Sequence, residues 1–139
     1  MTILRFAALS AALLCAPAQA QGQPGTAGPP VLRRDLLRAA LSPAKTVTLV
    51  DGKEVTLGPK QKAPVHLHPC PVVGVVTVGV IAFQVEGEPV RRLRAGDAFY
   101  EPAGARILRF DNEGDTPAVF TAFYLAGPDD HELIRLLPN

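Results

Sequence analysis

The sequence predicts an all-β fold, a barrel, sandwich or jelly roll, over residues 45–127 of its 139 residues. Short segments rich in β-branched and aromatic residues recur throughout this stretch. Turn-forming clusters such as Asp51-Gly52, Glu86-Gly87 and Asn112-Glu113-Gly114-Asp115 separate them. Eight or more short strands with regular turn signals are typical of these architectures.

The strands follow from this pattern in chain order. We expect them at residues 46–50, 54–57, 65–68, 90–93, 98–101, 106–110 and 118–125, with two more within residues 72–85. Asp51-Gly52 lies between the first two and is a strong hairpin signal. The apolar run from Val72 to Val85 should divide near Gly79, because a glycine within a strand marks a bend or turn.

Residues 1–20 have the features of a cleavable signal peptide. Arg5 gives a positively charged start, Phe6 to Ala16 is a short apolar stretch, and Ala18-Gln19-Ala20 fits a cleavage site. The apolar stretch is shorter than the roughly 20 residues that a membrane-spanning helix needs. We therefore expect an exported protein, periplasmic or secreted, with no membrane association after cleavage.

Residues 21–44 form a leader and residues 128–139 a tail. Gln21 to Pro30 is rich in Gly and Pro, which is typical of a flexible segment. The apolar residues of Val31 to Leu41 fit one helical face, so we expect a short helix, or an arm that packs on the barrel or on a second subunit. In the tail, the segment HELIRLL (residues 131–137) could form a last helical turn or two.

Charge and cysteine content exclude several classes of protein. The chain has 14 Lys and Arg residues against 13 Asp and Glu residues, which is not the basic footprint of a nucleic-acid-binding protein. Removal of the signal peptide leaves Cys70 as the single cysteine, so a disulfide within the chain is excluded. The sequence also lacks the GxSxG, Walker, CxxC and GxGxxG motifs.

Several residues together resemble the two-part signature of the cupin superfamily. His66-Leu67-His68 is followed by a strand that reaches Gly79, and Gly96 is followed after five residues by Pro102-Ala103-Gly104. The segment RRDLLRAALS (residues 33–42) also resembles the leader found before many small single-domain cupins. The resemblance covers about residues 45–126 and implies a double-stranded β-helix, or jelly-roll, barrel.

The resemblance also implies a metal site, which this chain retains in part. The family binds a divalent metal with two His, a Glu and a later His. His66 and His68 occupy the first two places, whereas the Glu place falls at Val72 or Val73 and the last His place at Ile107. Residues two apart in a strand face the same way, so the two imidazoles could chelate Zn²⁺, Fe²⁺, Mn²⁺ or Ni²⁺. Alternatively, they are metal-free relics of a lost site.

A third ligand would have to come from another part of the chain. Glu101 could point into the barrel and complete a set of two His and one carboxylate. The simpler interpretation is a rim residue paired with an arginine. Cys70 could offer a thiolate to a soft metal, or be a half-buried loop thiol. His131 is expected to be solvated.

Four residues are candidates for contact with a small-molecule ligand. Val72 and Ile107 would make the pocket drier than that of an ordinary cupin. Tyr100 is adjacent to Glu101, although it alternates to the other face of its strand. Arg109 could hold a carboxylate or phosphate of the ligand, or pair with Asp111 or another acid.

Three functions remain open. The first, which we expect, is an exported cupin that binds a small molecule and, weakly, a divalent metal. The second is a metal-dependent enzyme of the oxygenase or isomerase type that uses His66, His68 and Glu101. The third is a partner-binding module, a homodimer through the strand from Ala118 to Leu125, whose two faces are both apolar.

Overall fold

The computed structural model describes residue 28 and residues 30–138, so the predicted signal peptide lies outside the described residues. Every strand belongs to the unit that begins at Arg34. The described residues contain no helix, and hence none that could cross a membrane. Val31 to Leu41 is irregular, and residues 31–40 are exposed. The predicted helix is therefore wrong, and the alternative of an arm remains. An isolated helix of this length is marginal in water unless one face is packed.

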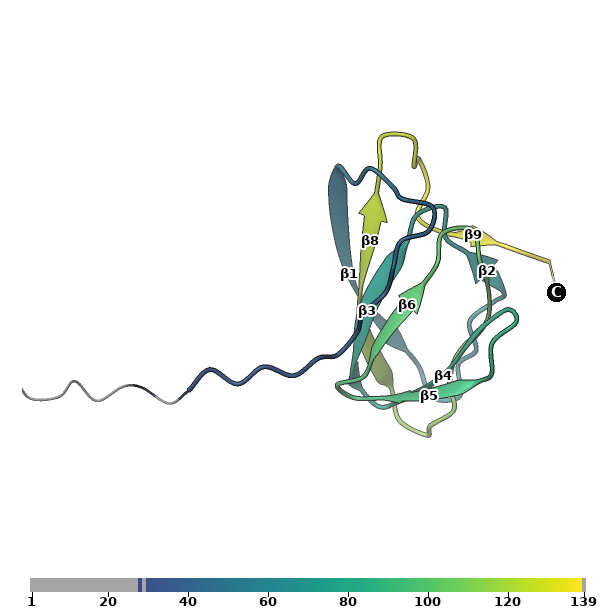
Figure 1. Cartoon of the computed structure of the whole chain (residues 1–139). Coiled ribbons are helices and arrows are strands. Elements are labelled where there is room, and N and C mark those ends of the chain that lie inside the picture. The colour runs from purple at the N-terminus through teal and green to yellow at the C-terminus, as the bar shows by residue number, and fades with distance from the viewer. Residues whose placement is uncertain (1–27, 29, 139) are drawn as a thin grey trace, which may run out of the picture. The chain divides into compact units, whose positions relative to one another are not determined.

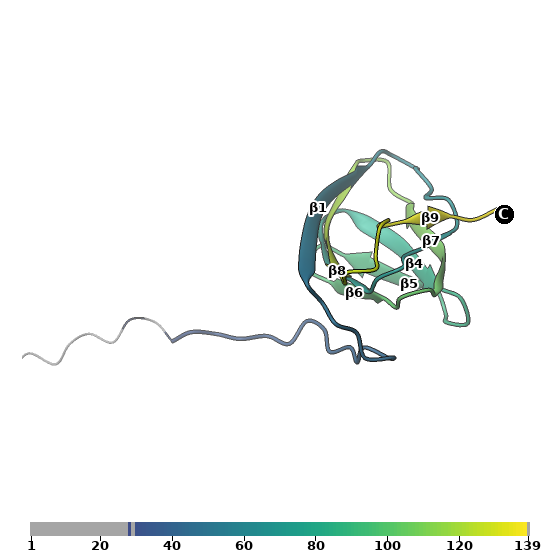
Figure 2. The ribbon, with the colours of Figure 1, turned by 90° about the horizontal axis from the view of Figure 1, so that it is seen from above.

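Two antiparallel sheets make up the fold (Figure 1). The strands are β1 (Leu49–Leu57), β2 (His66–Leu67), β3 (Val72–Val78), β4 (Val80–Val85), β5 (Arg91–Arg94), β6 (Ala98–Glu101), β7 (Arg106–Asn112), β8 (Ala118–Ala126) and β9 (Arg135–Leu136). Sheet A has the order β1-β8-β3-β6, and sheet B has the order β5-β4-β7-β2-β9. Seen from above, the sheets curve around a common interior, which confirms the predicted all-β jelly-roll barrel (Figure 2).

Gly79 is where the chain passes from sheet A to sheet B, between β3 and β4. Its φ of +81° is a conformation that side chains with a Cβ rarely adopt. A Cβ at this position would also lie 2.9 Å from the Cβ of Ala118. The predicted division of the long apolar run at this glycine is therefore confirmed, and the glycine is required for two reasons.

The predicted hairpin at Asp51-Gly52 is wrong. β1 runs straight through these residues and pairs with β8 along its whole length, from Leu49 opposite Ala126 to Leu57 opposite Ala118. Gly52 instead lies opposite Phe123, and a Cβ on it would approach that ring to 3.2 Å. The glycine therefore makes room for a cross-strand aromatic ring, a role that the local turn signal does not reveal.

The helical turn expected in the tail is also wrong. β9 pairs with β2, and the backbone N–H of Leu137 donates a hydrogen bond of 2.9 Å to the oxygen of Val65. In Figure 1, β2 and β9 lie together, away from β5 at the other edge of sheet B. The tail satisfies the backbone of a two-residue strand that would otherwise be an open edge.

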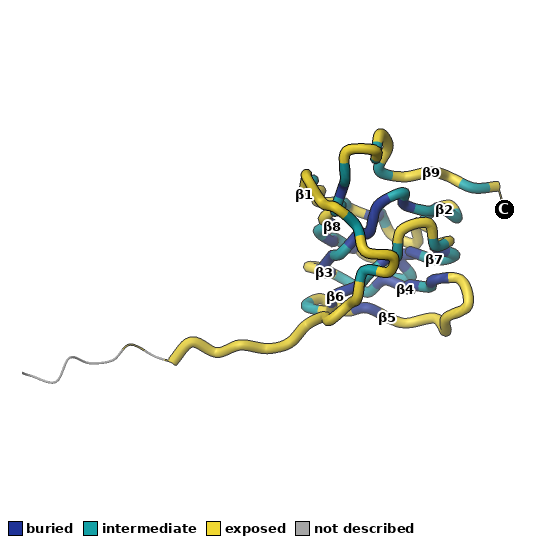
Figure 3. Tube along the Cα trace, turned by 45° about the horizontal axis from the view of Figure 1, so that its top comes forward, coloured by how far each residue is buried: buried dark blue, intermediate teal, exposed yellow. Residues whose placement is uncertain are grey.

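Four phenylalanines join the two sheets in the core. Phe99 and Phe120 come from sheet A, and Phe83 and Phe110 come from sheet B. The ring of Phe99 contacts the other three rings at centroid distances of 5.1–6.0 Å. The buried residues follow the inward faces of the strands, whereas most of β1 is exposed (Figure 3).

The outer face of sheet A is partly exposed at β8. Phe123 on β8 is 41% exposed, and Leu36 and Leu37 of the arm lie beside it and Val73. None of these observations tests for a second copy of the chain. The homodimer therefore stays a prediction.

The close approach of Gly74 to Phe99 gives a test of the packing. A Cβ at Gly74 would meet the Phe99 ring and lie 2.5 Å from the backbone oxygen of Thr121. We expect Gly74→Ala to lower the free energy of unfolding by about 1–3 kcal/mol, since overpacking forces side chains and backbone to shift. Denaturant unfolding measures the change. Gly28→Ala is the control, because nothing lies within 4 Å of that position; equal stability of the two variants would contradict the packing described.

Candidate metal centre

A cavity of about 180 Å³ lies inside the barrel and is bounded by both sheets. Its polar residues are His66, His68, Glu101 and Tyr124. The apolar residues that line it are Val55, Leu57, Ala63, Val72, Phe99, Phe110, Phe120, Ala122 and Ile134. The polar residues are therefore set in an otherwise hydrophobic enclosure.

His66 is held by strand pairing on both sides. Its backbone lies opposite Ile107 of β7 and Leu136 of β9, and the residue is 6% exposed. Nδ1 lies 2.8 Å from the backbone oxygen of Pro64. Because a carbonyl oxygen can only accept, Nδ1 carries the proton and donates it, which leaves the Nε2 lone pair available.

His68 is oriented in the same manner by the tail. Its Nδ1 donates to the backbone oxygen of Leu133 at 2.5 Å, and its ring meets that of His66 edge to face at 5.0 Å. The tail is fixed where it leaves β8, because Asp130 accepts a hydrogen bond of 2.7 Å from the Gly127 N–H and pairs with Lys45 at 2.6 Å. A turn far away in the sequence thus helps to set the orientation of this imidazole.

Glu101 ends β6 and points into the cavity. It is 3% exposed, and its Oε2 lies 2.9 Å from Nε2 of His68. The interpretation of Glu101 as a rim residue paired with an arginine is therefore wrong. Its backbone lies opposite Val72, so its side chain projects from the same face as that residue. A carboxylate thus reaches the region of the family's Glu place from the neighbouring strand.

The carboxylate sets the charge of the neighbouring imidazole. Burial favours the neutral form of His68, but the hydrogen bond and the charge of Glu101, together with the Leu133 carbonyl, outweigh burial and raise the pKa of His68. Burial, followed by the charge of Glu101, raises the pKa of Tyr124, so this phenol keeps its proton. In the metal-free protein, the contact with Glu101 at 2.9 Å therefore favours the protonated form of His68.

The three residues have the geometry of a metal site. One ligand atom from each of His66, His68 and Glu101 lies within 4.8 Å of the others. Two of these atoms, His68 Nε2 and Glu101 Oε2, are 2.9 Å apart. Hydrogen bonds from Nδ1 to backbone oxygens are the usual support of metal-ligating imidazoles. This group could hold a divalent ion.

The other candidate ligands lie apart from this group. Cys70 is fully buried, more so than a half-buried loop thiol, and it is not one of the clustered residues. Burial, followed by the charge of Asp130, raises the pKa of its thiol. His131 is exposed, as expected. Among the described residues, His66, His68 and Glu101 form the cluster that can hold a metal.

Of the four residues predicted to contact a small-molecule ligand, one lines the cavity and three do not. Val72 lines the cavity, and Ile107 is fully buried beside His66 without bounding it. Tyr100 borders a separate surface depression next to Pro71 and Ala103. The structure does not bring Tyr100 to the cavity, in agreement with its alternation away from Glu101.

Arg109 also lies away from the cavity, because of an irregularity in β7. Arg109 is opposite Gln84 and Ile107 is opposite Val85, so Leu108 has no partner across the pair. One extra residue reverses which face the following side chains occupy. Arg109 donates instead to Asp111 at 3.0 Å and to Glu113 at 2.7 Å. The alternative of an arginine paired with nearby acids is therefore correct.

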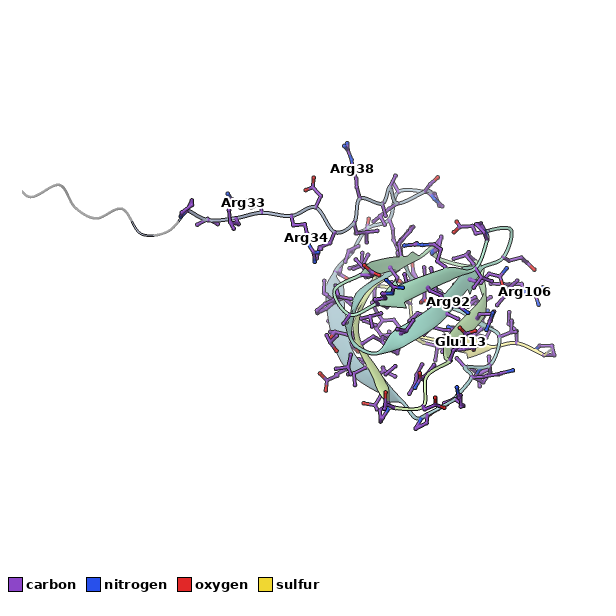
Figure 4. The ribbon with its side chains drawn as sticks, turned by 90° about the horizontal axis from the view of Figure 1, so that it is seen from below. Arg33, Arg34, Arg38, Arg92, Arg106 and Glu113 are labelled. Atoms are coloured by element: carbon purple, nitrogen blue, oxygen red, sulfur yellow. The ribbon has the colours of Figure 1, made fainter. Side chains whose placement is uncertain are left out.

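Figure 4 labels Glu113, the partner of Arg109, and a second arginine near it, Arg92. Arg92 of β5 points toward Glu113, with a shortest distance of 3.1 Å between the charged groups. The two arginines together lower the pKa of Glu113, the hydrogen bond from Arg109 being the larger cause. Arg109 is therefore committed to a surface network.

Two contributors to the site were not predicted from the sequence. Tyr124 lines the cavity beside His68, with ring centroids 5.4 Å apart. Alternation along β8 could have indicated it, since Ala122 and Phe120 line the same cavity. The Leu133 carbonyl could not have been found, because it is a backbone group placed by non-local pairing of the tail.

Comparison with known proteins gives a family and a set of similar folds. The family described as the cupin domain matches residues 53–124. An oxalate oxidase bound to the substrate analogue glycolate has a TM-score of 0.55 and 25% identity over 63% of this chain and 46% of its own. A cupin-superfamily sugar phosphate isomerase from Silicibacter pomeroyi has a TM-score of 0.50 and 26% identity over 57% of this chain and 52% of its own.

A DMSP lyase from Ruegeria pomeroyi has a TM-score of 0.55 and 24% identity over 63% of this chain and 42% of its own, which shows a shared fold alone. This chain thus spans only about half of the length of these proteins, or less. No curated protein matches it at a significant level.

The contacts of Asp130 give a pH-dependent prediction. The hydrogen bond and charge of Lys45, with the Gly127 N–H, lower the pKa of Asp130 below its ordinary 3.8. A lowered pKa in the folded state stabilises the fold above the unfolded-state pKa, and this contribution is lost as the pH falls through the folded-state value. We expect Asp130→Asn to be less stable than the wild type at pH 7, and the difference to vanish at acid pH. Urea unfolding at several pH values measures it; a difference independent of pH would contradict this assignment.

Proposed function

Since this chain belongs to the cupin family, we propose that it binds a divalent metal ion through His66, His68 and Glu101 and holds a small molecule in the adjoining cavity. The observation that carries this proposal is the convergence of one carboxylate and two imidazoles inside an apolar barrel. Each imidazole is already fixed at Nδ1 by a backbone oxygen, which presents its other nitrogen as a ligand.

The second ring nitrogen of His66 is available to a metal. Nδ1 of His66 is held by the backbone oxygen of Pro64, so Nε2 is the nitrogen that can act as a ligand. His68 and Glu101 contact each other at 2.9 Å in a buried position, where any charge that they carry is costly to desolvate. A divalent ion would engage all three groups at once and compensate the carboxylate charge.

The donor set limits the choice of metal without fixing it. Two imidazoles and a carboxylate suit Zn²⁺, Fe²⁺, Mn²⁺ and Ni²⁺. The bound ion would supply Lewis acidity to an oxygen of the molecule beside it. The chain itself contributes the orientation of the ligands and an enclosure whose apolar walls limit access of water.

A second candidate function is that of a metal-dependent enzyme of the oxygenase or isomerase type. Three protein ligands leave coordination positions open for a substrate. An oxalate oxidase and a sugar phosphate isomerase share the fold at 25% and 26% identity. Turnover that requires the metal and is lost with Glu101 distinguishes this candidate from a binding protein.

Export belongs to the same proposal. The charged start, short apolar stretch and Ala18-Gln19-Ala20 of the sequence support removal of residues 1–20. We expect the protein from an export-competent host to begin at Gln21, as measured by intact mass spectrometry of the exported fraction. A full-length chain retained with the cells would contradict this part of the proposal.

The metal centre is tested by the metal content of residues 21–139 purified without chelator. We expect about one ion per chain after incubation with Zn²⁺, Fe²⁺, Mn²⁺ or Ni²⁺. Loss of a ligand should weaken binding by about 100-fold or more in His66→Ala and in Glu101→Ala. Elemental analysis and metal titration measure both quantities.

His131→Ala is the matched control, since this histidine is exposed and lies outside the cluster. Its metal content should equal that of the wild type. Equal metal content in the wild type and all three variants would show that the ion binds at another site. No metal in the wild type would identify the histidines as relics.

A further inference from the structure

The cavity offers a ligand very few polar partners. Apart from the three proposed metal ligands, the hydroxyl of Tyr124 is the polar side-chain group among the residues that line it. The described lining includes no Lys, Arg, Ser, Thr, Asn or Gln. A molecule with several hydroxyl groups would therefore leave most of them without hydrogen-bond partners, which is unfavourable in a buried site.

The charge of the loaded site favours one negative group. A divalent ion and the Glu101 carboxylate together carry a single positive charge when both imidazoles are neutral. One carboxylate on the ligand would neutralise this charge. A phosphate dianion would leave excess negative charge in an enclosure that has no lysine or arginine in its described lining.

Three phenylalanines are the largest apolar side chains that line the cavity. Phe99, Phe110 and Phe120 all border it, and their ring centroids are 4.7–5.8 Å apart. Ala63 and Ala122, which have small side chains, also line the cavity. The volume of about 180 Å³ exceeds the roughly 150 Å³ of an apolar protein cavity that binds benzene. A ring-sized apolar body therefore fits, and aromatic edges are available for its packing.

We infer that the cavity selects a small monocarboxylate with a compact, ring-sized apolar body and rejects polyhydroxylated or phosphorylated molecules. This inference rests on the proposed metal centre, which receives the carboxylate. It separates this chain from a sugar phosphate isomerase of the same fold, because beyond the metal ligands the described lining offers a sugar's hydroxyl groups only the side chain of Tyr124.

Tyr124 has a specific part in this selection. Its ring lies beside His68 at the wall of the cavity, and the residue is only partly buried. A carboxylate that faces the metal centre with one oxygen has a second oxygen to satisfy. The Tyr124 hydroxyl is the donor available to it from the described lining.

The test uses the zinc-loaded protein, residues 21–139. It compares two probes of similar shape, one with apolar and one with polar substituents. The probes are 3,5-dimethylbenzoate and 3,5-dihydroxybenzoate, since a methyl group and a hydroxyl group are similar in size. We expect the dimethyl probe to bind at least tenfold more tightly by calorimetry. Equal or tighter binding of the dihydroxy probe, or no binding of either, overturns the inference.

Variants on one strand locate the binding. Val55 of β1 lines the cavity, whereas Val50 of the same strand is 56% exposed and does not. Val55→Phe should fill part of the cavity and weaken binding of the dimethyl probe at least tenfold, with zinc content unchanged. Val50→Phe should bind the probe as the wild type does. Equal affinity in the two variants would place the probe outside the cavity and overturn the inference.

Tyr124→Phe tests the hydroxyl without changing the cavity walls. We expect the affinity for the dimethyl probe to fall about tenfold, as for loss of a hydrogen bond to a charged group, with zinc content unchanged. Unchanged affinity overturns the role of Tyr124. Zinc content is measured on every sample, so that a failure to bind zinc overturns the proposed function, while bound zinc with the wrong probe preference overturns this inference alone.

Discussion

The contact between His68 and Glu101 is the constraint on which the site depends. A carboxylate that is 3% exposed must be paired, because an isolated charge in an apolar cavity is strongly destabilised. Its partner follows β2 of sheet B, whereas Glu101 belongs to β6 of sheet A. His68 can serve as partner only when its ring is turned correctly, which the Leu133 carbonyl ensures. The carbonyl is in place because the tail leaves β8 at the Asp130 turn and returns as β9 beside β2.

Local patterns predicted most of the fold, and non-local pairing accounts for the errors. β6 has the predicted bounds, and β8 differs by one residue, because alternation and turn residues are properties of short segments. Asp51-Gly52 has the composition of a turn, yet the nine-residue pairing of β1 with β8 prevails over that preference. The tail forms a strand because β2 lacks a partner on that side. The residues of β1 do not indicate that they pair with β8, and those of the tail do not indicate that they pair with β2.

The distinction between local patterns and non-local pairing applies to the site as well. The spacing of His66 and His68 and the alternation of Tyr100 and Glu101 are period-two features, and the placement of all four side chains follows them. The prediction for Arg109 extended that alternation through β7, where the unpaired Leu108 reverses it. The proximity of Glu101 to the histidines depends on strand order across two sheets. Sequence could therefore suggest the carboxylate as a ligand, but the structure was needed to show its 2.9 Å approach to His68.

The cavity and the core share the same side chains, which couples stability to selectivity. Phe99, Phe110 and Phe120 join the two sheets and also line the space beside the metal centre. A polar substitution that would admit a hydroxylated ligand would remove aromatic contacts between the sheets, at a cost of several kcal/mol for loss of a buried Phe. His68 and Glu101 are restricted for a different reason, since each is fixed by a partner on another strand or loop. The barrel can therefore change its ligand most readily at Val55 and Tyr124, which line the cavity while remaining only partly buried.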